Sequence, residues 1–432
     1  MSKKMNQPLE EWIKPENITM VIMGIELIKT TIVLGYNTYE EQDFACYYEH
    51  MQNILRGNLE YDKIGSRAGG LVYPALHTYI LLFFYQYLSD DGMYFRPVQC
   101  FSAITYLGCV YLMIKITQLA FKKEPKRANI LILHCFTWTI YNIAIVKLFN
   151  DLYCVFFSLL GVYLFQKSQN FAGVLMFSLS LGIKMSACLY LPAIYFIASR
   201  SEGILIGTLY LIFIAAFQIL IALPFLEVSA HGYISSAFDT TRGFLLQHSF
   251  TFKFLPTDFG DNFWFKTVTL SIHLFSLLYF LLFKWTTLKK VFKEISLWPF
   301  RFLPSFKEQD PLFIAEVFFI CNFTGILWSR GIHFQFIIWF LFSFPFLIEV
   351  GSPSIRHWRA RHVISLFCIF ELFLSIRPDY LVATATMVHI GMMIVWIRLC
   401  MKPRTEENKL ENLEHEMIED HTKEREFEFL PR

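Results

Sequence analysis

Acidic and aromatic side chains gather between residues 34 and 74, the first long polar interruption of an otherwise apolar sequence. Glu41 and Asp43 stand at the start of a stretch, 44–55, in which apolar residues recur every three to four positions. That spacing predicts a helix lying on a membrane surface with its apolar stripe turned down. A carboxylate there meets water and lipid headgroups together. Asp43, or Glu41 if the helix starts elsewhere, is therefore a candidate base for a sugar hydroxyl carried on a lipid.

The same acidic residues also fit a structural role. Thr38 and Glu41 have the spacing of a capping box, and Asp43 is itself a residue type that caps helices. For an acidic residue taken in isolation, capping is the more common role. Only the wider pattern of the chain favours catalysis at Asp43.

Two charged positions interrupt later apolar runs. Asp151 follows Asn150 at the end of one run, and Lys184 lies inside the run 171–198. Charged groups within a membrane are costly, so each is a candidate site residue. The structural alternatives are that Asp151 starts the next helix, and that Lys184 extends to the interface or pairs with a carboxylate such as Glu26.

A third group of candidates follows in two polar segments. Arg242 and Lys253 fall in the stretch 227–266, which is rich in aromatic and small polar residues, and Arg330, His333 and Gln335 sit at a later junction. Fixed cations of this kind can hold a lipid phosphate as it leaves, because they offset its growing negative charge. The alternative is that they are ordinary interfacial anchors.

The composition requires a membrane protein. Hydrophobic residues make up 55% of the chain, charged residues 17%, and phenylalanine alone accounts for 47 residues. Apolar runs close to the length that crosses a bilayer recur along it, which predicts an all-α polytopic bundle of about ten to twelve spans. The predicted spans are 17–35, 71–89, 97–121, 129–149, 152–167, 171–198, 204–226, 267–285, 311–328, 331–349, 362–376 and 380–400. The sixth is long enough to be kinked or to form two pieces.

Basic segments between these runs predict the orientation. Basic residues lie before the first span (Lys3, Lys4 and Lys14), in Lys284–Lys307, in Arg356–Arg361 and directly after the last span (Lys402 and Arg404), so an even number of spans places them together on the cytoplasmic side. The same count puts the basic loop Lys122–Arg127 on the opposite side, against the trend. Residues 1–402 then form the transmembrane domain, with two long lumenal loops at about 36–70 and 227–266. Residues 403–432 form a charged cytoplasmic tail.

The sequence also excludes several classes of partner. A net charge of +2 gives no reason to expect nucleic acid. The nine cysteines show no C-x-x-C or Cys/His spacing for zinc, and no carboxylate cluster has the spacing of a magnesium site. We therefore expect neither a metal nor a cofactor.

Seven motifs in register resemble one family over roughly residues 20–400. They are Glu41-Gln42-Asp43 with Tyr47, Tyr61-Asp62 with Leu71-Val72-Tyr73-Pro74, Leu148-Phe149-Asn150-Asp151, Ile183-Lys184-Met185, Gly232-Tyr233 with Ala237-Phe238-Asp239, Arg242-x-Phe244, and Ser329-Arg330-x-x-His333-Phe334-Gln335-Phe336 with Trp339. In this order they are similar to the dolichyl-phosphate-mannose-dependent α-1,3-mannosyltransferases of asparagine-linked glycosylation. The chain departs from that pattern at Ala68-Gly69-Gly70 and at 248–253, where the family's indoles are missing.

The resemblance implies a multi-pass enzyme of the endoplasmic reticulum membrane, in the multispanning class that uses lipid-phosphate sugars. Its donor is dolichyl-phosphate mannose, its acceptor a lipid-linked pentamannosyl oligosaccharide, and its catalytic carboxylate maps to Glu41 and Asp43. Arg330 with Lys253 or Arg242 would hold the lipid phosphate, while His333 and Gln335 would bond sugar or phosphate oxygens. Tyr73, Asp151 and Lys184 are further expected contacts of donor or acceptor.

Two other functions remain open at this stage. One is a related transferase that makes a different acceptor linkage. The other is a membrane transporter, although no internal repeat relates the two halves of the sequence.

Overall fold

The protein is a helical bundle, seen in a computed structural model that describes residues 15–40, 43–89, 95–125, 127–128, 137–239, 246–286, 309–352, 356–376 and 381–402. The longer helices are α2 (Pro15–Tyr36), α3 (Asp43–Leu55), α4 (Ala75–Tyr87), α5 (Arg96–Ala120), α7 (Asp151–Gln166), α8 (Asn170–Ile183), α9 (Leu191–Glu202), α10 (Ile204–Ala237), α11 (Phe263–Phe280), α13 (Pro311–Leu327), α16 (Arg356–Ser375) and α17 (Val382–Met401). Glu41, Arg242 and the predicted tail 403–432 lie outside the described residues.

Short elements complete the described chain. They are the strands β1 (Gly65–Ser66) and β2 (Gly69–Gly70), the helices α6 (Thr139–Tyr141), α14 (Ile338–Leu341) and α15 (Phe344–Val350), the 3₁₀ turns η1 (Tyr61–Lys63), η4 (Met185–Tyr190), η5 (Leu246–His248), η6 (Thr257–Asp261) and η8 (Phe334–Ile337), and the π-helical turns η3 (Asn142–Val146) and η7 (Leu281–Trp285). The two strands pair antiparallel, with Gly65 opposite Gly70.

The all-α membrane class is confirmed. In the described part of the chain five helices are long and apolar enough to cross a membrane, or six if the broken pair Thr139–Val146 and Asp151–Gln166 is one span. The predicted count of ten to twelve was higher because several apolar runs form shorter pieces. The run 331–349 divides into η8, α14 and α15, and the run 171–198 divides at Lys184, as its length suggested.

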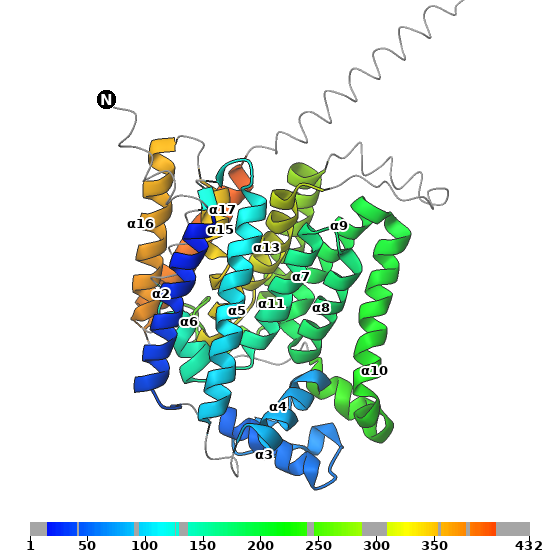
Figure 1. Ribbon diagram of the computed structural model, residues 1–432. Coiled ribbons are helices and arrows are strands. Elements are labelled where there is room, and N and C mark those ends of the chain that lie inside the picture. Colours follow the sequence, from blue (N-terminus) through cyan, green and yellow to red (C-terminus); the bar gives the residue numbers. More distant parts are fainter. Residues whose placement is uncertain are drawn as a thin grey trace, which may run out of the picture.

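The predicted span 71–89 is also wrong, and this explains the misplaced basic loop. Helix α4 has 13 residues, about 20 Å of helix against about 30 Å of hydrocarbon. It lies with α3 beneath the bundle, at the end away from the start of α2 (Figure 1). With one crossing fewer, α5 returns to the side on which α2 begins.

Hydrogen bonds between α2 and α5 fix this direction. Gln118 near the end of α5 bonds Thr19 near the start of α2 at 2.8 Å, and Arg96 at the start of α5 bonds the carbonyl of Asn37 just after α2 at 3.0 Å. The two helices are therefore antiparallel. The loop Lys122–Arg127 lies at the same end as the start of α2, which removes the conflict with the distribution of basic residues.

An ion pair places the residue after α17 at the same end, which we call the basic end. Lys402 after α17 pairs with Glu316 of α13 at 2.5 Å. Gln166 at the end of α7 donates to the carbonyls of Ile116 and Pro311, at 3.2 and 2.8 Å. The opposite end of the bundle, which we call the loop end, carries α3, α4 and the β1–β2 hairpin (Figure 1).

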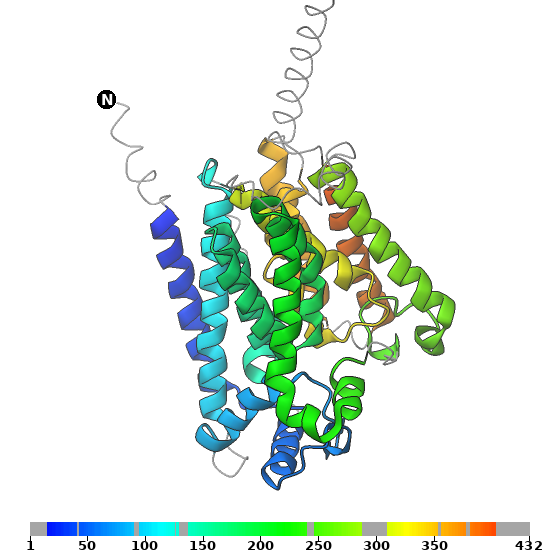
Figure 2. The same ribbon diagram turned by 90° about the vertical axis from the view of Figure 1, so that its right-hand side faces the viewer.

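Helix α10 joins the two ends and turns beneath the bundle at the loop end (Figures 1 and 2). Pro224 lies inside it, and Ser229 has the non-helical angles φ −156° and ψ 95°. Proline removes one backbone hydrogen bond and crowds the preceding turn, so a kink follows. Beyond the kink, Tyr233 packs on fully buried Tyr61 of the first loop, with ring centroids 4.8 Å apart.

Close packing of α7 on α8 positions the charged residues of the bundle. A Cβ added to Gly161 of α7 would lie 2.7 Å from the ring of Phe177, and one added to Gly173 of α8 would lie 2.5 Å from Phe165. Each glycine thus makes room for a phenylalanine of the other helix. The N-terminus of α7 and the C-terminus of α8 meet at the loop end of this pair, and there the chain places Asp151 and Lys184.

Candidate functional site

Two breaks in the helices open the polar centre of the molecule. The segments Thr139–Val146 and Asp151–Gln166 are bent by 113°, and Leu148 between them has φ 55°. A leucine in the left-handed region is unusual and costs free energy, which points to a constrained functional segment. Across from it, Lys184 ends α8 in an extended conformation. Both breaks leave polar side chains facing each other inside the bundle.

Lys184 and Asp151 form a buried ion pair at these breaks. The Lys184 ammonium lies 2.6 Å from Asp151 Oδ1 and 3.3 Å from Asn150 Oδ1. The Trp339 indole N–H donates to the same Asp151 oxygen. Asp151 is fully buried, and its Oδ2 has no hydrogen-bond partner among the described residues. Burying two charges costs desolvation free energy, which is offset only when the geometry of the pair is good. A buried ion pair is therefore a candidate for a functional role.

Aromatic rings surround the Lys184 ammonium on several sides. Its nitrogen lies 4.6 Å from the ring centroid of Phe336, 5.3 Å from that of Tyr73 and 5.5 Å from that of Trp339. These distances fall within the range of cation–π attraction. The charge of Lys184 therefore stands in an aromatic chamber built by Tyr73, which precedes α4, and by the η8–α14 segment.

A line of side chains joins this chamber to the first loop. The hydroxyl groups of Tyr73 and Tyr47 are 3.1 Å apart, and Tyr47 lies one helical turn after Asp43 in α3. Burial raises the pKa of Tyr47 well above its ordinary value, and Tyr73 and Asp43 add to the rise. Burial also raises the pKa of Tyr73, while Lys184 lowers it. Asp43 and Lys184 therefore both act electrostatically on Tyr73.

Tyr73→Phe is expected to destabilise this connection. It leaves the buried Tyr47 hydroxyl without its Tyr73 partner, which costs about 1–2 kcal/mol of folding free energy. Thermal unfolding of the detergent-solubilised protein measures the loss. The exposed Tyr87→Phe is the matched control, since it removes a hydroxyl from the far end of α4. Equal unfolding temperatures for both variants would show that the hydrogen bond between Tyr47 and Tyr73 does not contribute to stability.

Helix α3 has a hydrogen-bond partner at its start that was not predicted, and its apolar stripe does not lie on lipid as predicted. The Tyr39 hydroxyl accepts hydrogen bonds from the backbone amides of Phe44 and Ala45, at 3.0 and 3.3 Å. Tyrosine thus caps this helix, and half-buried Asp43 is its first residue. The apolar stripe of α3 packs on protein rather than on lipid, because Phe95 and the aromatic residues of α4 cover it: Tyr48 stacks edge-on to Tyr85 at 5.2 Å.

The second polar loop is tied to the segment that carries His333. The Phe250 amide donates to the Ile332 carbonyl at 2.9 Å, and the Ile332 amide donates to Ser249 Oγ at 2.8 Å. The His333 ring lies 6.3 Å from that of His248. Burial, followed by the nearby His248 and Lys184, lowers the pKa of His333 to about 4. At neutral pH His333 is therefore an uncharged hydrogen-bonding group beside the aromatic chamber.

Acidification is expected to destabilise the protein through His333. Its pKa in the folded state, about 4, lies below the ordinary value of 6.5, so the unfolded chain binds more protons between these two values. Stability is full above pH 6.5 and falls as the pH drops toward 4, by up to about 2 kcal/mol at pH 5. Thermal unfolding at pH 7.5 and pH 5 should show a smaller acid loss for His333→Asn. The exposed His231→Asn should behave as the parent does.

The structure brings some of the predicted site residues together and leaves others apart. Lys184, Asp151 and Tyr73 share the chamber, and His333 lies close enough to Lys184 to respond to its charge. Half-buried Arg330 and Gln335 lie on the same segment as His333. Lys253 instead donates to the Gln247 carbonyl of its own loop.

One alternative partner proposed for Lys184 is wrong. Glu26 accepts hydrogen bonds from Tyr106, at 2.7 Å, and from Tyr141, and it pairs with Lys29 at 3.2 Å. It therefore belongs to a separate polar cluster between α2, α5 and α6. Among the described residues no three His, Cys, Asp or Glu side chains form a group that could hold a metal ion, and the expectation of no metal stays a prediction.

Sequence reasoning did not single out His77, and it named Trp339 only as part of a motif, without a role in the site. His77 of α4 bonds Asn150 through Nδ1 at 2.9 Å, and its buried Nε2 has no partner in the described part of the chain. Trp339 holds Asp151, as described above. The sequence did contain a signal for His77, because it is an ionisable side chain inside the apolar run 71–89, which was counted as a membrane span.

The bundle and its chamber define a multispan membrane protein with a polar, aromatic-walled site near one end of the bundle. The particular family follows from comparison with known proteins. The family model described as ALG3 protein matches residues 20–376. The chain therefore belongs to the ALG3 family, and the resemblance predicted from the sequence motifs is confirmed.

Curated relatives agree with this assignment. A human protein named Dol-P-Man:Man(5)GlcNAc(2)-PP-Dol alpha-1,3-mannosyltransferase is 27% identical, over 85% of this chain and 82% of its own. A Dictyostelium discoideum protein with the same name preceded by "Probable" is 27% identical over 88% and 90%. Among solved structures, ArnT from Cupriavidus metallidurans bound to undecaprenyl phosphate is a distant likeness, with TM-score 0.43 and 12% identity over 88% of this chain and 76% of that one.

Proposed function

We propose that this chain transfers mannose from dolichyl-phosphate mannose to the pentamannosyl di-N-acetylglucosamine pyrophosphodolichol acceptor, in α-1,3 linkage. The observation that carries the proposal is the family match over residues 20–376, together with relatives named for this reaction over more than four fifths of their length. The aromatic chamber at the loop end supports it, because such a site suits a sugar delivered on a membrane lipid.

Asp43 acts as the base in this reaction. The donor carries β-linked mannose and the product is α-linked, so the anomeric carbon inverts once. A single displacement does this: Asp43 takes the proton of the acceptor's 3-hydroxyl, the oxygen bonds the anomeric carbon, and the phosphate leaves with the electron pair of the broken bond. The position of Asp43 at the start of α3, half-buried and one turn from Tyr47, supports this role. Glu41 remains the alternative base.

Lys184 stabilises the leaving phosphate. An ammonium group has three N–H donors, and within the described chain Asp151 and Asn150 engage two of them. The phosphate gains negative charge as its bond to mannose breaks, and a cation in a water-poor chamber stabilises that charge strongly. Arg330, His333 and Gln335 approach from the facing segment, where neutral His333 bonds phosphate or sugar oxygens. Buried Asp151 Oδ2 and His77 Nε2, which lack partners among the described residues, offer further contacts.

The site faces the lumen of the endoplasmic reticulum, and the enzyme is a multi-pass protein of that membrane. The gathering of Lys122–Arg127 and Lys402 at the basic end supports this orientation, since positive segments stay in the cytoplasm. The loop end, with Asp43 and the chamber, is then lumenal. Protease protection of an epitope inserted after Gly57 tests the orientation: digestion without membrane permeabilisation would contradict it.

Product analysis tests the reaction itself. Microsomes from cells lacking the endogenous activity are supplied with this protein, the lipid-linked donor and the pentamannosyl acceptor. The expected product has one additional mannose, removable by an α-1,3-specific mannosidase. A product with another linkage would assign the chain to a related transferase. Movement of a solute without any covalent product would instead favour a transporter.

A further inference from the structure

The segment that leads into the bend before Asp151 is held by side chains from three other helices. This segment, residues 139–146, consists of α6 and η3, and we call it the α6–η3 arm. Glu371 of α16 accepts hydrogen bonds through Oε1 from the backbone amides of Trp138 and Thr139, at 3.0 and 3.2 Å, and from the Thr139 hydroxyl at 2.9 Å. The first amides of a helix have no partner within it. A carboxylate from another helix therefore caps the start of the arm.

Two further contacts hold the arm beyond its start. Fully buried Glu26 of α2 accepts a hydrogen bond from the Tyr141 hydroxyl, and the ammonium of Lys29 lies 4.6 Å from the centroid of the same ring. Gln99 of α5 donates to the Ile145 carbonyl in η3 at 3.1 Å. Turns of the π-helical type are rare and often lie at functional sites. Helices α2, α5 and α16 thus fix the arm from its first residue to its last turn.

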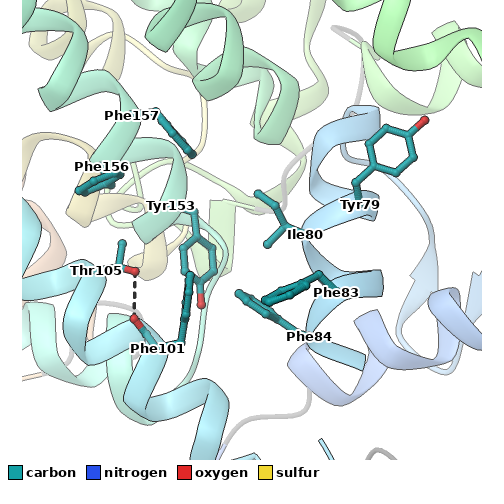
Figure 3. A pocket seen from close by; sticks show the side chains of 9 residues that line it. All are labelled: Tyr79, Ile80, Phe83, Phe84, Phe101, Thr105, Tyr153, Phe156 and Phe157. Carbon is teal, nitrogen blue, oxygen red and sulfur yellow. Dashed lines mark hydrogen bonds between the residues drawn. The ribbon is translucent and has the colours of Figure 1, made fainter. Parts of the chain in front are cut away.

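Helix α5 also holds the chain after the bend. Ser102 lies one turn from the glutamine that bonds η3, on the same face of α5, and its Oγ is 2.7 Å from the hydroxyl of Tyr153 in the first turn of α7. The Tyr153 ring stands beside Phe84 of α4 and Phe101 of α5, with ring centroids 5.5 and 6.1 Å away (Figure 3). One face of α5 therefore grips the chain on both sides of the bend.

The connection from the arm to the chamber is short and bonded to the arm. Residues 147–150 join η3 to α7, and the Phe149 amide donates to the Ile143 carbonyl at 3.2 Å. Asp151 follows directly and lies 2.6 Å from the Lys184 ammonium. The attraction between two charges weakens as they separate. A shift of the arm is therefore expected to weaken this ion pair.

We propose that Glu26, Glu371 and Gln99 are positioning residues of mannose transfer. They fix the α6–η3 arm so that Asp151 meets Lys184 in the chamber. The proposal rests on the proposed function, in which the Lys184 charge stabilises the leaving phosphate. Glu26 and Glu371 are carboxylates buried inside the bundle, and ionisable groups kept there at high cost are usually functional.

The interaction between Lys184 and Asp151 reports the position of the arm. Its strength is measured by a double-mutant cycle of Lys184→Met and Asp151→Asn, from unfolding of the detergent-solubilised protein. The cycle is carried out in the parent and again in Glu371→Leu, which removes the cap of the arm. In Glu371→Leu the interaction should fall to about half of the parental value or less, because Asp151 is displaced. Glu371→Gln keeps an oxygen acceptor and should restore most of it.

Thr19→Val is the matched control for both measurements. It removes the hydroxyl that Gln118 bonds at 2.8 Å, a contact between α2 and α5 at the basic end. We expect the parental interaction between Lys184 and Asp151 from it, and the parental turnover.

Turnover provides the second measurement. Glu371→Leu should lower kcat about tenfold, because a small displacement of a positioned group slows a reaction strongly. KM for donor and acceptor should stay within about twofold, since the interaction that is lost acts in the transition state. In the double variant Lys184→Met/Asp151→Asn, Glu371→Leu should change kcat by less than about twofold, because the pair through which it acts is gone. A purely structural residue would lower stability and leave kcat per folded molecule unchanged.

The two measurements separate this inference from the proposed function. A parent that makes no mannosylated product would remove the proposed function, while the cycle in Glu371→Leu still decides whether the arm positions Asp151. An unchanged interaction between Lys184 and Asp151 in Glu371→Leu overturns the inference. An equal loss of kcat in the parent and in the double variant overturns it as well.

A gentler variant covers the case in which Glu371→Leu does not fold. Tyr141→Phe removes only the hydroxyl that Glu26 binds and leaves the cap at Glu371 in place. The same two changes are expected from it, a weaker interaction between Lys184 and Asp151 and a lower kcat. Parental values of both in a folded Tyr141→Phe protein would overturn the inference.

Discussion

Replacing Asp43 with asparagine is expected to abolish mannose transfer while leaving the protein folded. The change removes the proton acceptor but keeps the size of the side chain, and general-base catalysis contributes roughly 10²–10⁴-fold to rate. Stability should hold because asparagine keeps the size of the side chain and the Tyr39 hydroxyl accepts hydrogen bonds from the amides of Phe44 and Ala45. The measurement is the turnover of the purified protein with the lipid-linked donor and acceptor, together with its unfolding temperature.

Glu40→Gln is the matched control for this experiment. Glu40 is an exposed carboxylate three residues before Asp43 in the same loop, so its loss changes the net charge of the loop equally. We expect the activity of the parent from it. Turnover of Asp43→Asn within a few-fold of the parent would remove Asp43 from the mechanism and make Glu41 the residue to test. Loss of activity together with a lower unfolding temperature would instead assign Asp43 a structural role.

The charged residues of the site were predictable from sequence, but their pairing was not. Asp151 and Lys184 each interrupt an apolar run, and the cost of burying a charge singles them out. Which carboxylate meets Lys184 depends on how α7 packs on α8. Glu26 was an equally allowed partner until the structure showed it bonded to Tyr106 and Tyr141. Local sequence carries no record of such contacts between helices.

Helix α4 shows why the predicted count of spans exceeded the number of membrane-crossing helices in the described part of the chain. A short helix that packs aromatic residues against α3, α5 and α7 needs the same composition as a membrane span. Hydropathy alone cannot separate the two. Pro74 before the helix and its end at Tyr87 limit α4 to 13 residues, and His77 within it was the one local sign of a different role.

The largest stability effect is expected at the buried ion pair. Lys184→Met leaves Asp151 charged, buried and without its cation, which costs about 3–5 kcal/mol of folding free energy. The double variant Lys184→Met/Asp151→Asn should recover most of that loss, because it removes both charges and keeps an oxygen acceptor for the Trp339 indole. The interaction energy from this double-mutant cycle is the measured quantity.

Activity then distinguishes the two roles of Lys184. If it only holds the chamber together, the stable double variant transfers mannose as the parent does. If its charge stabilises the leaving phosphate, the double variant stays folded and remains about 10²-fold slower, because the cation that lies against Asp151 in the chamber is gone. Lys402→Met is the control: it breaks the pair with Glu316 at the basic end, far from the chamber, and should lower stability without changing turnover per folded molecule. We expect the slow double variant, since removing the Lys184–Asp151 pair from water is costly and a charge kept inside the bundle at that cost is usually functional.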